Sequence, residues 1–173
     1  MKILKKILIA IVAFIALILI VALFAPKEFG GKSEIIINKS QQEVYDYIKF
    51  LKNQDNYGTW YQMDPNMKKS YKGTDGTVGF TYEWQSEKWM VGTGKQIITN
   101  LDGQKMESDL FFEDHPEPAK SVISVTEKAP DETLVKWSVK GETDYPFNIF
   151  NLFFNMDKDF EEGLQNLKNQ LEK

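Results

Sequence analysis

An uninterrupted apolar run near the N-terminus limits the architectures open to this chain of 173 residues. Residues 7–25 carry no charged and no polar side chain, three lysines precede the run, and Pro26 ends it. A helix of that length rises about 28 Å, which is close to the thickness of the hydrocarbon core of a bilayer. The pattern therefore predicts one N-terminal transmembrane helix within a membrane anchor of residues 1–26.

Two other interpretations of this segment stay open, a cleaved signal peptide and a buried core helix. The apolar run is longer than that of a typical signal peptide, and no small-residue cleavage site follows it. Lysines before a span favour a cytoplasmic N-terminus, so we expect a single-pass protein of the cell membrane with its domain on the extracytoplasmic side. Residues 27–33, with a glycine pair, are predicted to be a short tether, and residues 34–173 the folded domain.

The composition of the remainder excludes several classes of function. All 25 acidic residues and 18 of the 21 basic residues follow residue 26, so the domain is net negative and we expect no nucleic-acid partner. Arginine and cysteine are absent, which excludes guanidinium clamps, disulfides and thiolate chemistry. His115 is the single histidine, and no zinc or nucleotide-binding motif is present, so we expect no metal and no cofactor.

The domain begins with patterns typical of one strand and two short helices. The β-branched residues 35–37 predict the strand. Ser40 and Glu43 have capping-box spacing at the start of a helix whose apolar positions fall on one face. A second short helix is expected around residues 57–62.

Six antiparallel strands and one long helix are predicted to complete the domain. Apolar and polar residues alternate along each predicted strand, and short turns separate the strands. The final helix is expected to begin near Pro146, because an apolar stripe with helical spacing follows it through Leu171. The strands cover about residues 68–72, 78–84, 91–99, 106–113, 121–125 and 133–139.

Six segments together carry a family resemblance: EIIINKSQQEVYDYI (34–48), NYGTWYQMDPNM (56–67), KGTDGTVGFTYEW (72–84), GTGKQIITN (92–100), TLVKWSVKG (133–141) and FEEGLQNLKNQLEK (160–173). Their order resembles the helix-grip fold of the SRPBCC superfamily, which includes START domains, the birch-pollen allergen family and polyketide cyclase/dehydrase-like proteins. The resemblance implies an α+β domain whose curved antiparallel sheet wraps around a long C-terminal helix and encloses an apolar cavity. Members bind lipids, sterols or polyketides, and some are enzymes.

The function that this resemblance implies is membrane-anchored binding of a hydrophobic small molecule or lipid, without catalysis. The membrane partner would be contacted through residues 7–25. The aromatic residues expected to line the cavity could instead pack together as a filled core, which would bury their surface more completely. The expected ligand-binding residues, with Trp60 at the entrance, are Trp60, Phe80, Tyr82, Trp84, Phe112, Trp137 and Phe150.

Other functions stay open beside this one. A cyclase- or hydratase-like enzyme would need an acid or base, for which tyrosines, carboxylates and His115 are candidates, although strand alternation places no carboxylate toward the cavity. A protein-interaction module with a filled core is a third class, and Trp89 in a hairpin could contact a membrane or a partner. A calcium site would have to use Asp55, Asp64 or Asp75, which lack EF-hand spacing.

Overall fold

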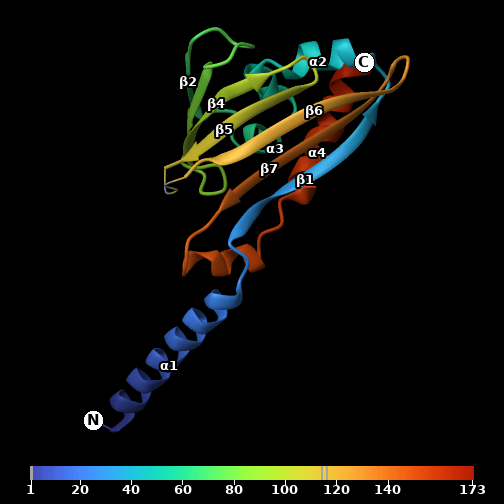
Figure 1. Ribbon diagram of the computed structural model, residues 1–173. Coiled ribbons are helices and arrows are strands. Elements are labelled where there is room, and N and C mark those ends of the chain that lie inside the picture. Colours follow the sequence, from blue (N-terminus) through green and yellow to red (C-terminus); the bar gives the residue numbers. More distant parts are fainter. Residues whose placement is uncertain (1, 114, 116) are drawn as a thin grey trace. The chain divides into compact units, whose positions relative to one another are not determined.

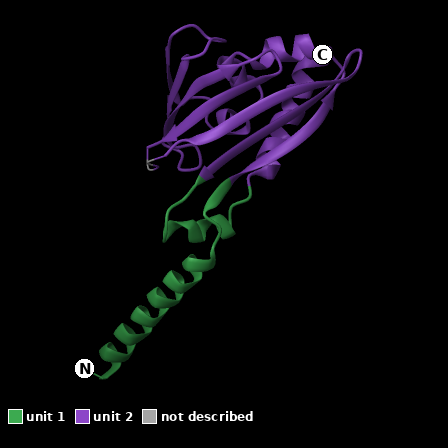
Figure 2. Cartoon of the chain, viewed as in Figure 1, with its two compact units in different colours: residues 1–29, 142–155 green, residues 30–141, 156–173 purple. Residues whose placement is uncertain are grey.

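The computed structural model describes residues 2–113, 115 and 117–173, and the chain forms two compact units (Figures 1 and 2). The first unit combines residues up to 29 with residues 142–155. The second unit combines residues 30–141 with residues 156–173.

The first unit contains two helices. Helix α1 (Lys2–Phe24) is apolar, with a mean hydropathy of 3.5 over its most apolar window, and Ala22 is its buried residue. By length and composition it is a candidate membrane span or a signal sequence. The second helix, η2 (Phe147–Leu152), is a 3-10 helix that follows the Tyr145–Pro146 cis peptide bond.

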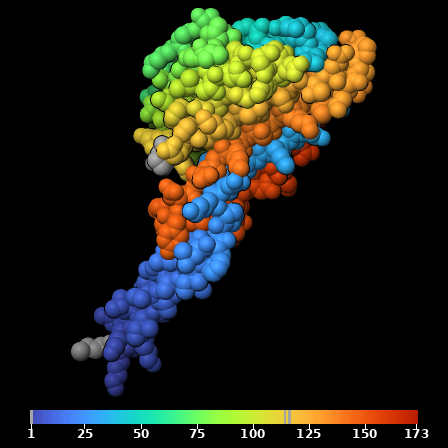
Figure 3. Space-filling model, in the orientation of Figure 1, coloured from blue at the N-terminus to red at the C-terminus, as the bar shows by residue number. Residues whose placement is uncertain are grey.

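The second unit is built on a curved, seven-stranded antiparallel sheet with the strand order β1-β7-β6-β5-β4-β3-β2. Strands β2 to β7 follow one another as a meander, and β1 pairs with the last of them. Figure 3 shows side chains of β4 to β6 covering one face of this unit. The strands are β1 (Glu28–Ile37), β2 (Lys68–Lys72), β3 (Thr81–Gln85), β4 (Thr93–Leu101), β5 (Lys105–Phe112), β6 (Ala119–Ala129) and β7 (Glu132–Glu142).

Four helical segments accompany the sheet: α2 (Gln41–Ile48), η1 (Leu51–Asn56), α3 (Thr59–Met63) and α4 (Asp157–Leu171). The predicted capping box is confirmed: the backbone N–H of Glu43 donates to the Ser40 hydroxyl, and that of Ser40 donates to the Glu43 carboxylate. Helix α4 buries Phe160, Leu164 and Leu167 against the rest of the unit. The α+β class and the antiparallel meander are therefore as the sequence predicts.

The closing helix is shorter than the apolar stripe predicts, and this part of the prediction is wrong. Helix α4 begins at Asp157 instead of near Pro146, and residues 147–152 form the separate helix η2. Phe150 and Phe153 are 55% and 78% exposed. The reason is hydrogen bonding to a distant part of the chain, because the side-chain amides of Asn148 and Asn151 donate to backbone carbonyls at the end of α1 and just beyond it.

Residues 28–33, predicted to be part of a tether, lie in strand β1. Gly30 has a φ of +136°, and a Cβ there would lie 2.0 Å from the carbonyl oxygen of Val139 in β7. The glycine thus permits close approach of two strands, whereas the composition of this segment suggests flexibility.

A smaller difference from the predicted strand of residues 78–84 occurs at β3, which begins at Thr81 because residues 77–79 form a turn.

We predict that Gly30→Ala destabilises the folded chain far more than Gly103→Ala. Both glycines have positive φ, but nothing lies within 4 Å of a Cβ at Gly103. The Gly103 variant should lose about 1–2 kcal/mol from backbone strain alone, and the Gly30 variant roughly 3 kcal/mol or more because a backbone oxygen must also move. Urea unfolding of the full chain in detergent, followed by near-UV circular dichroism, measures both. Equal losses would contradict the close approach of β1 to β7.

Candidate ligand-binding cavity

The second unit contains a partly enclosed cavity of about 140 Å³. Residues from η1, α3, α4, the loops and strands β3 to β7 surround it, and none of the lining side chains is charged. The lining residues are Gln54, Trp60, Tyr61, Met67, Trp84, Met90, Val91, Gln96, Leu110, Phe112, Ser121, Trp137, Val139, Met156 and Phe160.

Aromatic rings in edge-to-face contact form much of the wall. The ring of Phe160 in α4 lies 5.1 Å from that of Trp137 in β7 and 5.1 Å from that of Trp60 in α3, between ring centroids. On another side, the Trp84 and Phe112 rings lie 6.0 Å apart. Such contacts add to the burial of apolar surface and hold the rings in fixed orientations.

A polar cluster interrupts this apolar wall. The hydroxyl of Tyr61 lies 3.1 Å from Oε1 of Gln54 and 3.2 Å from Oε1 of Gln96, and it donates toward both oxygens. Gln96 in turn donates through Nε2 to the hydroxyl of Ser108 at 2.7 Å. Because a phenol has one proton, the two amide oxygens retain capacity to accept another hydrogen bond. Nε2 of Gln54 has no hydrogen-bond partner among the described residues.

A second network lies beside the first. The hydroxyl of Tyr82 donates to Asp55 at 2.6 Å, and the ammonium group of Lys69 lies 2.9 Å from the same carboxylate. Burial, and then the hydrogen bond to Asp55, raise the pKa of Tyr82. Burial, and then the charge of Asp55, raise the pKa of Tyr61. Both phenols therefore keep their protons near neutral pH and act as hydrogen-bond donors, not as bases.

Four of the seven residues that the sequence singled out, Trp60, Trp84, Phe112 and Trp137, line the cavity. Phe80 and Tyr82 are buried but do not line it; Phe80 stacks on Tyr71, with 6.3 Å between the ring centroids. Phe150 belongs to the first unit and is exposed.

Sequence reasoning missed the polar part of the cavity. Gln96 gave one signal, because it has the same strand parity as the buried Ile98 and therefore points inward. Tyr61 lies in the aromatic segment that the sequence places as a lid at one mouth of the cavity, together with Tyr57, Trp60 and Met63. Gln54 gives no signal, since it lies on a short 3-10 helix whose faces the sequence pattern does not determine.

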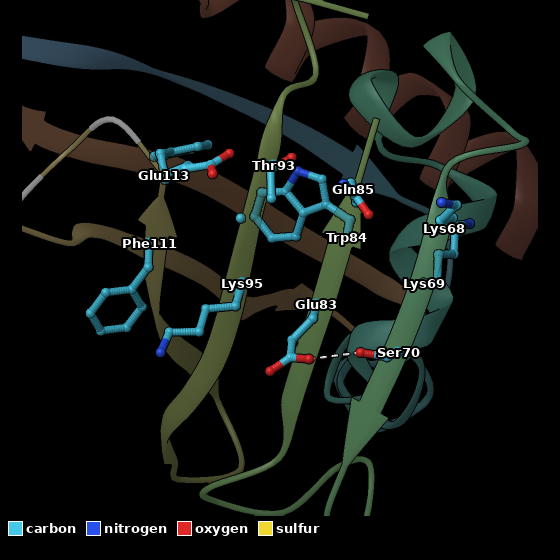
Figure 4. A pocket seen from close by; sticks show the side chains of 12 residues that line it. Lys68, Lys69, Ser70, Glu83, Trp84, Gln85, Thr93, Lys95, Phe111 and Glu113 are labelled. Atoms are coloured by element: carbon cyan, nitrogen blue, oxygen red, sulfur yellow. Dashed lines mark hydrogen bonds between the residues drawn. The ribbon is translucent and has the colours of Figure 1, made fainter. Parts of the chain in front are cut away.

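A larger and more open groove, of about 700 Å³, runs over strands β2 to β5 (Figure 4). Among its lining residues, Ser70 donates to Glu83 at 2.7 Å, and the ammonium group of Lys95 lies 4.7 Å from the centroid of the Phe111 ring. Trp84 reaches the groove because its ring lies over Gly94, where a Cβ would come within 2.6 Å of it. The enclosed cavity is the better candidate site, since its polar atoms retain hydrogen-bonding capacity.

The alternative candidates for chemistry lie elsewhere. No group of three or more potential metal-ligating side chains occurs among the described residues. Asp55 is engaged by Tyr82 and Lys69, and Asp75 accepts hydrogen bonds from the backbone of Leu51 and Lys52. Asp64 accepts one from Ser86. His115 is not among the cavity-lining residues, and its neighbours at 114 and 116 lie outside the described part of the chain.

Comparison with known proteins supports the fold. No protein-family model matches the sequence, and a search of curated proteins finds no match. Truncated norcoclaurine synthase from Thalictrum flavum is 12% identical with a TM-score of 0.65, over 83% of this chain and 93% of that one. The Aha1 dimer from Colwellia psychrerythraea is 14% identical with a TM-score of 0.56, over 83% and 96%. An uncharacterised protein from Bacillus thuringiensis is 14% identical with a TM-score of 0.56, over 84% and 100%.

At these levels of identity the likeness shows the fold alone. The second unit has the helix-grip fold of Bet v 1-like and START-like proteins, as the sequence resemblance implies. An apolar cavity between the curved sheet and the C-terminal helix is consistent with that fold.

We predict that Tyr57→Phe and Tyr82→Phe have opposite consequences near neutral pH. Both side chains are fully buried, but the hydroxyl of Tyr57 makes no hydrogen bond of normal geometry among the described residues. Burial, the largest influence, raises the pKa of Tyr57, and Gln54 lies near enough to lower that pKa by a smaller amount without satisfying the hydroxyl. Removing it should be neutral or slightly stabilising, whereas Tyr82→Phe should cost about 1–2 kcal/mol because Asp55 loses a donor. Urea unfolding at pH 7 distinguishes the two. A clear loss of stability in the Tyr57 variant would contradict this account.

The same variants should alter how stability falls in alkali. Burial raises the pKa of Tyr57 and Tyr82 above the unfolded value near 10, so above that pH the unfolded chain has released protons that the folded chain keeps. Stability is thus intact below pH 10 and falls above it, by up to about 1.4 kcal/mol per pH unit for each phenol. Each variant should show a shallower fall, while Tyr145→Phe, at an exposed position, should follow the parent chain.

Proposed function

We propose that this chain is held at a membrane by α1 and uses the cavity of its second unit to bind a small, largely apolar molecule with one hydrogen-bonding group. The observation that supports this most directly is the combination of an uncharged aromatic wall with the Gln54–Tyr61–Gln96 cluster. Buried polar atoms with unused hydrogen-bonding capacity are costly unless a partner satisfies them.

The size of the cavity narrows the class of ligand. Its volume of about 140 Å³ is below the roughly 300–1,000 Å³ of pockets for drug-sized molecules. An apolar cavity of about 150 Å³ in another protein accommodates one benzene molecule. We therefore propose a ligand, or the buried part of one, that consists of a single ring or a short acyl segment, rather than a whole sterol or phospholipid.

The polar cluster favours a hydroxyl-bearing ring over a hydrocarbon. A ligand hydroxyl could donate to an amide oxygen of Gln54 or Gln96 and accept from Nε2 of Gln54. Norcoclaurine synthase, which has a similar fold, has a structure in complex with dopamine and hydroxybenzaldehyde. Both ligands contain a single hydroxyl-bearing ring, but dopamine also carries an ammonium group, for which the lining of this cavity offers no carboxylate.

The proposal assigns binding rather than catalysis to the cavity. Its lining contains no carboxylate, ammonium or imidazole group, and the raised pKa of Tyr61 keeps that phenol protonated. General acid–base catalysis needs a group that exchanges its proton near the working pH.

The membrane part of the proposal rests on the length and hydropathy of α1 and on the lysines before it. These lysines favour a cytoplasmic N-terminus, which would expose the cavity on the extracytoplasmic side.

The test uses phenol and toluene as matched probes, which differ by a hydroxyl in place of a methyl group. Isothermal titration calorimetry of the full chain in detergent should show tighter binding of phenol. Gln96→Leu should weaken phenol binding about five- to tenfold through the loss of one hydrogen bond, with little effect on toluene. Gln85→Leu, at an exposed position on β3, is the control.

A cavity-filling variant provides the second arm. Leu110→Trp adds a ring to the cavity wall and should abolish binding of both probes while the far-UV circular dichroism stays native-like and urea unfolding stays cooperative. Binding that persists in this variant, or the absence of binding by the parent chain, would overturn the proposed function. Conversion of a probe during the titration would favour the enzymatic alternative.

A further inference from the structure

The first unit contains an exposed aromatic segment that the proposed cavity does not use. Residues 145–155 include no charged side chain and hold four of the chain's 12 phenylalanines. Most of their apolar side chains are open to the surroundings. Exposed fractions are 64% for Phe147, 55% for Phe150, 49% for Leu152, 78% for Phe153 and 54% for Phe154.

Hydrogen bonds fix this segment to the C-terminal end of α1, within the same unit (Figure 2). Nδ2 of Asn148 donates to the carbonyl oxygens of Ala22 at 2.8 Å and Ala25 at 2.9 Å. Nδ2 of Asn151 donates to the carbonyl oxygens of Pro26 and Lys27, both at 3.0 Å. The last carbonyls of a helix lack partners within it, so Asn148 completes the end of α1.

We propose that η2 and the residues after it, 147–154, form a second membrane-contact element that inserts its phenylalanines into the boundary between headgroups and hydrocarbon. This inference rests on the proposed anchoring by α1, because it places the segment at the depth where that helix leaves the bilayer. Aromatic side chains concentrate at this boundary, and apolar rings gain free energy by leaving water.

The chemistry of the segment fits a lipid surface. Burial in lipid would require no charged group to leave water, which is the most expensive step in membrane insertion. Residues 147–154 adjoin the C-terminal end of the apolar helix α1, to which Asn148 fixes them. The amide nitrogens of Asn148 and Asn151 already donate to backbone carbonyls, and Oδ1 of Asn151 accepts from Thr143. Oδ1 of Asn148 is already buried without a partner among the described residues, so insertion would remove no water from it.

The absence of cysteine in the natural chain allows a direct test. Single variants Phe153→Cys and Phe147→Cys of the full chain are labelled with bimane and reconstituted into vesicles of phosphatidylcholine and phosphatidylglycerol. Brominated lipids quench a label in the bilayer, and iodide quenches one in water. Phe14→Cys in α1 is the lipid reference, and Val78→Cys, at a 61% exposed apolar position in the second unit, is the aqueous reference.

We expect quenching by brominated lipid at 153 and 147 to reach at least about half of that at 14, with iodide quenching several-fold below that at 78. Lipid quenching at 14 combined with aqueous behaviour at both 153 and 147 would overturn this inference alone. Shielding of both positions from lipid and iodide would indicate burial by a second copy or another protein and would also overturn it. Aqueous behaviour at 14 would overturn the anchoring proposal and this inference together. Agreement between positions 147 and 153 guards against a variant that misfolds.

Discussion

The second unit depends on the close packing of α4 against the concave face of the sheet. Gly163 makes this approach possible, since a Cβ at that position would lie 3.0 Å from the Trp137 ring. Leu164 and Leu167, farther along the helix, are fully buried and do not line the cavity, whereas Met156 and Phe160, at its N-terminal end, do. One end of the helix thus completes a close-packed core, and the other end borders a cavity.

Most of the fold could be predicted from the sequence because the strands alternate between buried and exposed residues. In β7, for example, Val135, Trp137 and Val139 are buried, and their neighbours along the strand are not. That alternation is a local property of a half-buried sheet. The limits of α4 and β1 could not be predicted, because they depend on contacts between distant residues. Asn148 meets the end of α1 more than 120 positions away, and Gly30 meets Val139 of β7.

The candidate site could be predicted only in part, for a related reason. Strand parity correctly directs Trp84, Phe112 and Trp137 inward, but it also directs Phe80 inward, where the ring stacks on Tyr71 instead of facing the cavity. Strand parity predicts the face of the sheet on which a side chain lies. It does not predict which of the inward side chains border the cavity. The polar residues that would select a ligand come partly from short helices. In such short segments, neither helical periodicity nor strand alternation predicts which way a side chain points.

The apolar stripe of residues 150–171 predicts one buried helical face, yet its phenylalanines have two different environments. Phe160 contacts Trp137 inside the second unit, while Phe150 and Phe153 are exposed in the first. Burying one such ring is worth about 1.5–3 kcal/mol, so leaving several in water forgoes a substantial stabilisation. A bilayer around α1 would recover it at the point where that helix ends. The same periodic pattern can therefore serve a protein core in one half and a lipid boundary in the other. The two halves of the stripe differ in charge, because acidic and basic residues accompany Phe160 and none occurs from 145 to 156.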